Sequence, residues 1–258
     1  MPILSPTLFS QLINVMLAMA AVVFVSLYFV NAGYGQFRTK HWGWSIDNRV
    51  AWVLMEAPVF CVMLAIWMQT GHPLHVPELV LFAMFQLHYF QRSFIFPWLM
   101  HGHSRMPVAI VAMGALFNTI NGILQGGALF WYPNPDYAEG ASYLTSFQSV
   151  AGLALFAAGM AINLHSDHVI RHLRQPGDTR HYLPSRGYYR LVTSANYFGE
   201  LVEWIGFAAV ADTLAAWVFP IWTAANLVPR AHAIYNKYRT EFGAAALAGR
   251  KRIIPFIY

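Results

Sequence analysis

The stretch LFSQLINVMLAMAAVVFVSLYFV, residues 8–30, decides the fold of this chain. It contains no charged residue and is rich in Leu, Val, Met, Ala and Phe. A helix rises about 1.5 Å per residue, so roughly 20 apolar residues cross the hydrocarbon core of a bilayer. No basic residues precede the stretch and no convincing cleavage site follows it, so we expect a membrane-spanning helix rather than a cleaved signal peptide.

The composition of the whole chain is also that of a membrane protein. Of its 258 residues, 57% are hydrophobic and 10% are charged, and the mean hydropathy is +0.44. Soluble domains carry about 25% charged residues, so these values exclude an ordinary soluble domain and exclude disorder. The single cysteine, Cys61, excludes an internal disulfide, a CxxC redox pair and a zinc site with several cysteines.

Seven segments are apolar and long enough to be membrane-spanning helices. They run over residues 8–30, 50–69, 78–97, 107–131, 146–166, 190–208 and 212–229. Gly, Pro and charged residues separate them, and neither an internal repeat nor a long linker divides the chain. We therefore predict an all-α integral membrane protein with seven transmembrane helices in one domain, residues 1–258. The last two segments are the least regular, because they are short and acidic residues occur in or beside them.

The positions of the basic residues predict how these helices are oriented. All of the 16 Lys and Arg residues except Arg92 lie in alternate connections between the spans or in the C-terminal tail. The N-terminal segment and the remaining connections have none. Because basic residues gather on the cytosolic side of membrane proteins, we expect the N-terminus outside and the C-terminus in the cytosol. The sequence pI of about 9.4 follows from this topology and does not indicate a nucleic-acid partner.

Ionisable and amide side chains occur inside the predicted spans, where they are costly and usually functional. The ionisable ones are Glu56, His88, Arg92, Glu200 and Glu203, and the amides are Asn118, Asn121, Gln125, Asn163 and Asn196. Counted along the helices, most of them fall toward the cytosolic half. A transport path would also need polar groups in the outer half, so this bias favours a pocket open to the cytosol.

Two of the predicted helices each place polar residues along one face, at intervals of three or four residues. One series is Asn163, Asp167, Arg171 and Arg174, and the other is Asn196, Glu200 and Glu203. Amides and carboxylates bind a ribose or a carboxamide, and arginines bind phosphates as two-pronged donors. This pattern indicates a nucleotide site entered from the cytosol. Hydrogen bonding between helices inside the membrane is the alternative for any single residue.

Other chemistries lack their motifs. The chain has no GxGxxG, no GxxxxGK(S/T) and no GxSxG motif. The sequence therefore gives no support for a Rossmann unit, a P-loop or an acyl-transfer hydrolase. His165, His168 and His172 are spaced like part of a histidine box, but a membrane di-iron enzyme needs several such boxes. We therefore expect no metal.

Longer stretches of the chain match a known family. They are GYG at 33–35, AWVLMEAPVF at 51–60, LHYFQRSFIFP at 87–97, NGILQGG at 121–127, GMAINLHSDHVIRHLRQPG at 159–177, ANYFGELVEWIGFA at 195–208, NLVPRA at 226–231 and RKRIIPFIY at 250–258. In this order and spacing the chain resembles the steroid 5α-reductases, also called 3-oxo-5α-steroid 4-dehydrogenases. The run from 159 to 208, together with the C-terminal IPF-aromatic ending, is the most specific part of the resemblance.

The resemblance implies NADPH-dependent reduction of the Δ4 double bond of 3-oxo-Δ4 steroids to 5α-dihydro steroids. The resemblance implies that Glu56 and Tyr89 bind the 3-keto oxygen of the steroid. Hydride delivery to C5 moves negative charge onto that oxygen, and hydrogen-bond donors stabilise such charge. A glutamic acid in an apolar span favours its neutral form and can then donate, as a tyrosine can.

The resemblance also implies a set of NADPH-binding residues. They are Tyr34, Arg92, Arg105, Asn163, Asp167, Arg174, Asn196, Glu200, Arg230 and Tyr238. The chain departs from the family pattern near two of them. After Arg230 the family has two or three histidines, whereas this chain has one, His232, at a displaced position. In the loop before the sixth span, the basic residue, Arg180, is shifted from its position in the family pattern. We expect a monomer that takes NADPH from the cytosol and its steroid from the lipid phase.

Two other functions remain open at this point. A related membrane enoyl or polyprenol reductase would share the C-terminal half of the chain, and the Glu56–Tyr89 pair favours a steroid ketone over those substrates. A seven-helix receptor or transporter would place polar residues in both halves of the membrane or around an outward-facing pocket. The host membrane is a bacterial inner membrane or the endoplasmic reticulum, and the sequence does not distinguish the two.

Overall fold

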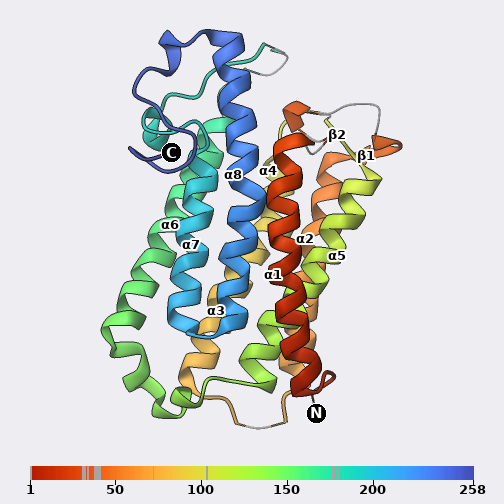
Figure 1. The fold of residues 1–258 in the computed structure, drawn as a ribbon, viewed down its shortest axis with the longest axis vertical. Coiled ribbons are helices and arrows are strands. Elements are labelled where there is room, and N and C mark those ends of the chain that lie inside the picture. Colours follow the sequence, from red (N-terminus) through yellow and green to blue (C-terminus); the bar gives the residue numbers. More distant parts are fainter. Residues whose placement is uncertain are drawn as a thin grey trace.

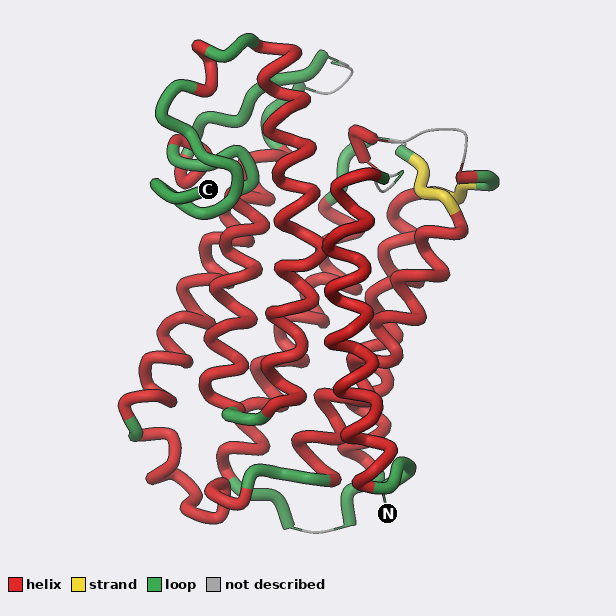
Figure 2. The backbone as a smooth tube through the Cα atoms, viewed as in Figure 1, coloured by secondary structure: helices red, strands yellow, loops and turns green. Residues whose placement is uncertain are grey.

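The computed structural model describes residues 2–30, 33, 35–37, 42–71, 73–102, 104–175, 178 and 180–258. Its helices lie side by side in one elongated bundle, with the connecting loops at the two ends (Figure 1). The described strands, β1 (Ser45–Asp47) and β2 (Arg105–Pro107), pair antiparallel in a small ribbon at one end (Figure 2). Everything else of regular structure in the described residues is helical.

The long helices correspond to the predicted spans. They are α1 (Pro6–Phe29), α2 (Asn48–Met68), α3 (Val76–Phe90), α5 (Val108–Gly126), α6 (Phe147–Arg171), α7 (Ala195–Ala211) and α8 (Leu214–Phe242). Shorter helical segments are α4 (Phe96–Leu99), two π-helical turns at Gln91–Ile95 and Gly127–Trp131, and 3-10 turns at Gly35–Phe37, Pro135–Thr145, Gly187–Arg190 and Ala245–Leu247. The prediction differs most at the helix ends. Helix α8 continues to Phe242 rather than 229, α3 ends at Phe90 rather than 97 and is followed by the π-helical turn and α4, and α7 begins at Ala195 rather than 190.

Within the described residues, four helical stretches are long and apolar enough to cross a membrane. They are Pro6–Phe29, Asn48–Met68, Val108–Trp131 and Phe147–Arg171. Of the other long helices, α3 carries His88 and is interrupted after Phe90, and α7 carries Glu200 and Glu203. The second half of α8 carries Arg230, Lys237 and Arg239. The chain is therefore a largely helical membrane protein. That all seven helices cross the membrane, and that the N-terminus lies outside, remain predictions.

The two ends of the bundle differ in charge. The ribbon, the connection from α6 to α7 and the C-terminal segment lie at one end, which we call the C-terminal end (Figure 1). The N-terminus and the connections α2–α3, α5–α6 and α7–α8 lie at the other (Figure 1). The described Lys and Arg residues, Arg92 excepted, belong to loops and helix ends of the C-terminal end or to the second half of α8, which holds Arg230. This segregation is the pattern from which the topology was predicted.

Glycines bring α6 and α7 into backbone contact. A Cβ on Gly199 of α7 would lie 2.5 Å from the main-chain N of Asn163, and a Cβ on Gly159 of α6 would lie 2.6 Å from the carbonyl oxygen of Gly199. Gly152 and Gly206 meet in the same way one pair of turns further along, with 2.8 Å between a Gly152 Cβ and the Gly206 oxygen. Small residues allow such close approach of membrane helices. The contact sets the register between the polar faces of α6 and α7.

A π-helical turn changes the direction of the helix that follows α3. Phe96 N donates to Gln91 O, five residues back, instead of four as in an α-helix. Pro97 follows and has no N–H to donate to Ser93, which explains the local widening of the helix. Arg92 lies within this widened turn. Isolated π-helical turns often occur at functional sites.

Candidate active site

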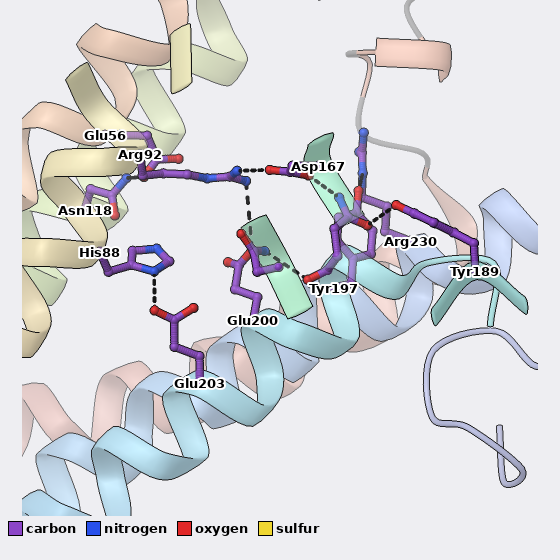
Figure 3. Close-up of polar contacts among 12 residues, drawn as sticks. Glu56, His88, Arg92, Asn118, Asp167, Tyr189, Tyr197, Glu200, Glu203 and Arg230 are labelled. Carbon is purple, nitrogen blue, oxygen red and sulfur yellow. Dashed lines mark hydrogen bonds and ion pairs between the residues drawn. The ribbon is translucent and has the colours of Figure 1, made fainter. Parts of the chain in front are cut away.

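Arg92 joins acidic side chains from two other helices (Figure 3). Its Nη1 donates to Asp167 Oδ2 of α6 at 3.1 Å, and its Nη2 lies 3.9 Å from Glu200 Oε2 of α7. The guanidinium also contacts two rings, with Cζ 4.6 Å from the centroids of both Trp52 and Phe96. The Arg92 side chain is only 11% exposed, so the cation and its carboxylates interact with little screening by water.

Asn163 and Asn196 extend this network between α6 and α7. Asn196 Nδ2 donates to Asp167 Oδ1 at 3.1 Å, and Asn163 Nδ2 donates to the main-chain oxygen of Asn196 at 3.0 Å. Tyr189, in the 3-10 turn before α7, donates from its hydroxyl to Asn196 Oδ1 at 3.3 Å. Five of the predicted cofactor residues, Arg92, Asn163, Asp167, Asn196 and Glu200, therefore form one connected group.

Arg230 of α8 joins the group through Tyr197. Its Nε donates to the Tyr197 hydroxyl at 2.7 Å, and Tyr197 follows Asn196 in the first turn of α7 (Figure 3). Tyr238 lies two turns further along α8, within electrostatic reach of Tyr197 and Arg174, and burial raises the pKa of Tyr238 to about 12. Both residues were predicted to bind the cofactor, and both lie beside the network.

Glu56 and Tyr89 come from α2 and α3. Asn118 of α5 donates to Glu56 Oε2 at 3.1 Å and to the main-chain oxygen of Met55 at 2.7 Å. Tyr89 is 3% exposed and stacks on Trp204 and Phe219, with ring centroids 5.7 and 6.4 Å apart. The hydrogen bond from Asn118 fixes the Glu56 carboxyl, and the rings fix the plane of Tyr89. A hydrogen bond in such an apolar environment is stronger than one in water.

His88 and Glu203 form a second buried polar contact, next to Tyr89 and between α3 and α7. His88 Nδ1 lies 2.7 Å from Glu203 Oε1, and their side chains are 5% and 0% exposed. The His88 ring also meets the Trp204 ring, with centroids 4.5 Å apart. The sequence marked both as polar groups within spans and placed Glu203 in the series with Asn196 and Glu200, but it did not predict that the two residues pair. His88 precedes Arg92 by four residues, and Glu203 follows Glu200 by three. Each therefore lies on the same helix face as a residue of the Arg92–Glu200 contact, and this spacing could have predicted their pairing.

Two predicted cofactor residues, Arg105 and Arg174, do not join the network in the described residues. Arg105 is exposed in β2, and its Nη2 donates to the main-chain oxygen of Ser45 in β1. The antiparallel pairing of β1 and β2 places these two residues within reach of one another. Arg174 is exposed just beyond the end of α6, at the same end of the bundle. Tyr34 lies outside the described residues.

The loop between α6 and α7 holds its own charge cluster. Arg180 Nε and Nη2 donate to the Asp178 carboxylate at 3.1 and 2.9 Å, and the Tyr182 hydroxyl donates to it at 2.6 Å. The hydrogen bonds from Arg180, followed by that from Tyr182, hold the pKa of Asp178 well below its usual range. Arg180, the residue shifted from the family pattern, therefore binds within the loop rather than to the Arg92 network.

Several buried polar atoms around the network have no hydrogen-bond partner in the described part of the chain. Ser166 Oγ, Ser194 Oγ and Arg171 Nη1 are among them. Ser166 precedes Asp167 on α6, and Ser194 lies at the start of α7. Together with the amides, carboxylates and arginines nearby, they form a donor and acceptor set that fits the carboxamide, ribose and phosphate groups of a dinucleotide.

Two contributors to this group were missed from the sequence. Tyr189 and Tyr197 were not predicted, because tyrosines are common at the ends of membrane helices and mark no site by themselves. In the structure Tyr189 binds Asn196, and Tyr197 binds Arg230. A search for metal sites over the described residues finds no group of three or more His, Cys, Asp or Glu side chains.

Comparisons with known proteins place the chain in a family. Residues 104–258 match the family described as 3-oxo-5-alpha-steroid 4-dehydrogenase. The 3-oxo-5-alpha-steroid 4-dehydrogenase 1 of Mus musculus is 38% identical over 93% of this chain and 92% of its own. That of Bos taurus is 35% identical over 93% of each chain, and the steroid 5-alpha-reductase DET2 of Arabidopsis thaliana is 33% identical over 91% of this chain and 90% of its own. The chain belongs to the 3-oxo-5-alpha-steroid 4-dehydrogenase family and is an oxidoreductase of the membrane.

Proposed function

We propose that this enzyme reduces the C4–C5 double bond of 3-oxo-Δ4 steroids with NADPH and yields 5α-dihydro steroids. The observation that carries the proposal is the juxtaposition of two environments at the end of α3 and in the π-helical turn that follows it. Tyr89, among aromatic rings, suits a flat apolar substrate with one ketone, whereas Arg92, less than one turn away, belongs to a polar group that suits a nucleotide. The names of the relatives point to the same reaction in those proteins.

The role proposed for Glu56 and Tyr89 is to bind the 3-keto oxygen of the substrate. As C5 is reduced, electron density moves through the enone onto that oxygen. Two hydrogen-bond donors at the oxygen stabilise the charge that develops there. Asn118 Nδ2 occupies one Glu56 oxygen, Oε2, and a proton on the other carboxyl oxygen could be donated to the ketone.

The polar group is proposed to hold the cofactor. NADPH, when bound, supplies the hydride that C5 takes up, and a proton that comes ultimately from water is added at C4. Asn163, Asp167 and Asn196 are proposed to bind its carboxamide and ribose groups. Arg174, Arg105 and Arg230 are proposed to bind its phosphates, because guanidinium groups bind phosphate oxygens as two-pronged donors.

The charge segregation supports a cofactor site that faces the cytosol. The network and the basic loops lie toward the C-terminal end of the bundle, and basic residues gather on the cytosolic side of a membrane. NADPH is then taken from the cytosol, and the steroid from the lipid phase. All seven helices are proposed to cross the membrane, with the N-terminus outside.

The experiment is a product assay. The purified protein, in detergent or lipid, is mixed with NADPH and testosterone or progesterone, and the products are identified by mass spectrometry against 5α and 5β standards. A 5α-dihydro product supports the proposal. Bound NADPH with no steroid product would overturn the substrate assignment and favour an enoyl or polyprenol substrate. A protein that binds no NADPH would overturn the cofactor assignment as well.

A further inference from the structure

The C-terminal segment Arg250–Tyr258 returns from the end of α8 and pairs with the residues that lead into α7. Lys251 N donates to Leu191 O at 2.8 Å, Thr193 N donates to Lys251 O at 2.9 Å, and Ser194 N donates to Arg252 O at 3.1 Å. Val192 and Lys251 form a parallel bridge. Such a short parallel pairing is weak by itself, so side-chain contacts must hold it in place.

Two side chains provide these contacts. Ile253 is 0% exposed and packs against Leu201 of α7 and against Leu227 and Ala231 of α8. Arg252 lies between two rings, with Cζ 4.9 Å from the centroid of Tyr235 and 4.7 Å from that of Tyr258. Burial of an isoleucine and stacking of an arginine on two aromatic rings both favour this conformation over a free tail.

Tyr258 makes hydrogen bonds within the segment and contacts helices α1 and α8. The Tyr258 main-chain oxygen accepts hydrogen bonds from Ile253 N at 2.8 Å and from Ile254 N at 2.9 Å. Its hydroxyl lies 3.4 Å from His232 Nδ1 of α8 and 3.4 Å from the Tyr28 hydroxyl of α1. The segment therefore contacts α1, α7 and α8, although it contains no helix of its own.

The part of α7 that the segment holds is the part that carries polar site residues. Ser194 precedes the helix, Asn196 contacts Asp167, and Tyr197 contacts Arg230. A helix leaves its first N–H groups without partners inside the helix, and its first turn is therefore the part most prone to fray. The main-chain oxygens of Lys251 and Arg252 accept hydrogen bonds from Thr193 N and Ser194 N, which immediately precede this turn. These bonds attach the start of α7 to the C-terminal segment.

We propose that residues 250–258 are a positioning strap, which holds the first turn of α7 so that Asn196 and Tyr197 are in place before NADPH binds. Preorganised side chains bind a ligand more tightly, because less order has to be imposed on binding. The cofactor half of this inference rests on the function proposed above. The structural half, the tie between the tail and α7, does not.

The test compares two isoleucines of the segment. Ile253→Ala removes a buried anchor, and Ile257→Ala, at a residue that is 75% exposed, is the matched control. Tyr258→Ala removes a ring beneath Arg252, and Tyr258→Phe keeps it. Each variant is assayed for hydrogen–deuterium exchange of peptides covering 191–200, for NADPH binding by fluorescence, for the KM of the steroid, and for the thermal unfolding temperature.

The strap predicts a local effect. Ile253→Ala and Tyr258→Ala should exchange faster in 191–200 and bind NADPH roughly tenfold more weakly. The steroid KM should stay within about twofold, and Ile257→Ala and Tyr258→Phe should resemble the parent. Unchanged exchange and NADPH affinity in both alanine variants would overturn the proposal. So would equal losses for NADPH and steroid with a lower unfolding temperature, since these indicate a general structural role.

Failure of the proposed function gives a different result. A parent protein that binds no NADPH would overturn that function and the cofactor half of the strap inference together. Exchange in 191–200 would still decide the structural half: faster exchange in Ile253→Ala than in Ile257→Ala supports a tie between the tail and α7, and equal exchange overturns it.

Discussion

Arg92 Nη1 lies 3.1 Å from Asp167 Oδ2, so the π-helical turn after α3 is bonded directly to the last turns of α6. The same guanidinium is 3.9 Å from Glu200 of α7. One cation thus compensates two carboxylates from two helices in the bundle interior. Such compensation offsets the cost of an arginine within a predicted membrane span.

Arg92→Lys is expected to be a severe change at this position. A lysine has no planar fork to reach both carboxylates and cannot stack between Trp52 and Phe96 as a guanidinium does. We expect NADPH binding to weaken at least about tenfold, because Asp167 and Glu200 lose their common partner. Arg186→Lys, at an exposed loop residue, is the control and should bind as the parent does. Parent-like binding by Arg92→Lys would show that the cation does not organise the cofactor site.

Glu56→Gln is expected to lower kcat about 10²-fold or more, a loss typical of a missing donor at a developing oxyanion, because an amide N–H is a far weaker acid than a carboxyl O–H. The glutamine keeps the size of the side chain and an oxygen for Asn118 Nδ2, which donates to Glu56 at 3.1 Å. NADPH affinity should therefore be nearly unchanged. The measurement is single-turnover reduction of a 3-oxo-Δ4 steroid, with Glu139→Gln, at an exposed acidic residue, as control. A fully active Glu56→Gln enzyme would remove Glu56 from the mechanism.

The His88–Glu203 contact permits a double-mutant test of a buried pair. Its atoms are 2.7 Å apart and both side chains are almost fully buried. Removing one partner should cost about 3–5 kcal/mol of stability, because it leaves the other polar group buried and unpaired. We expect His88→Leu and Glu203→Met each to lower the unfolding temperature in detergent, and the double variant to recover most of the loss. Additive losses would mean that each residue is needed for contacts other than this pair.

Much of this architecture was predictable from hydropathy and charge. Each predicted span overlaps a long helix, and the helical spacing of Asn163 with Asp167, and of Asn196 with Glu200, correctly placed polar groups on faces that meet. These predictions succeed because a membrane makes the position of every polar residue costly, so periodicity is informative.

The remaining features are ones that hydropathy does not reveal. The π-helical turn at Arg92 follows from hydrogen-bond geometry near Pro97, which no apolar pattern reveals. The β1–β2 ribbon turns Arg105 toward Ser45, although the residue type alone suits a phosphate. The length of α8 was underestimated because its last turns extend beyond the apolar stretch and are polar. The Arg105 contact is decided by a tertiary pairing, whereas the π-helical turn and the end of α8 are local features that an apolar pattern does not detect.

Gly159→Ala tests how closely α6 and α7 must pack for the site to form. The new Cβ would clash with the main-chain N of Glu203 and would lie 2.6 Å from the oxygen of Gly199, so the helices have to separate. Overpacking of this kind costs about 1–3 kcal/mol, and separation would also pull Asn196 from Asp167 and loosen the His88–Glu203 contact. We therefore expect a lower unfolding temperature together with weaker NADPH binding.

The control for this change is Gly71→Ala, because a Cβ at Gly71 meets nothing within 4 Å and its backbone is not left-handed. It should unfold and bind as the parent does. If Gly159→Ala lowered stability but left NADPH affinity intact, the cofactor residues would not depend on the register of α6 and α7. If it changed neither, the helices could separate at no cost, and the glycines would not determine how these two polar faces meet.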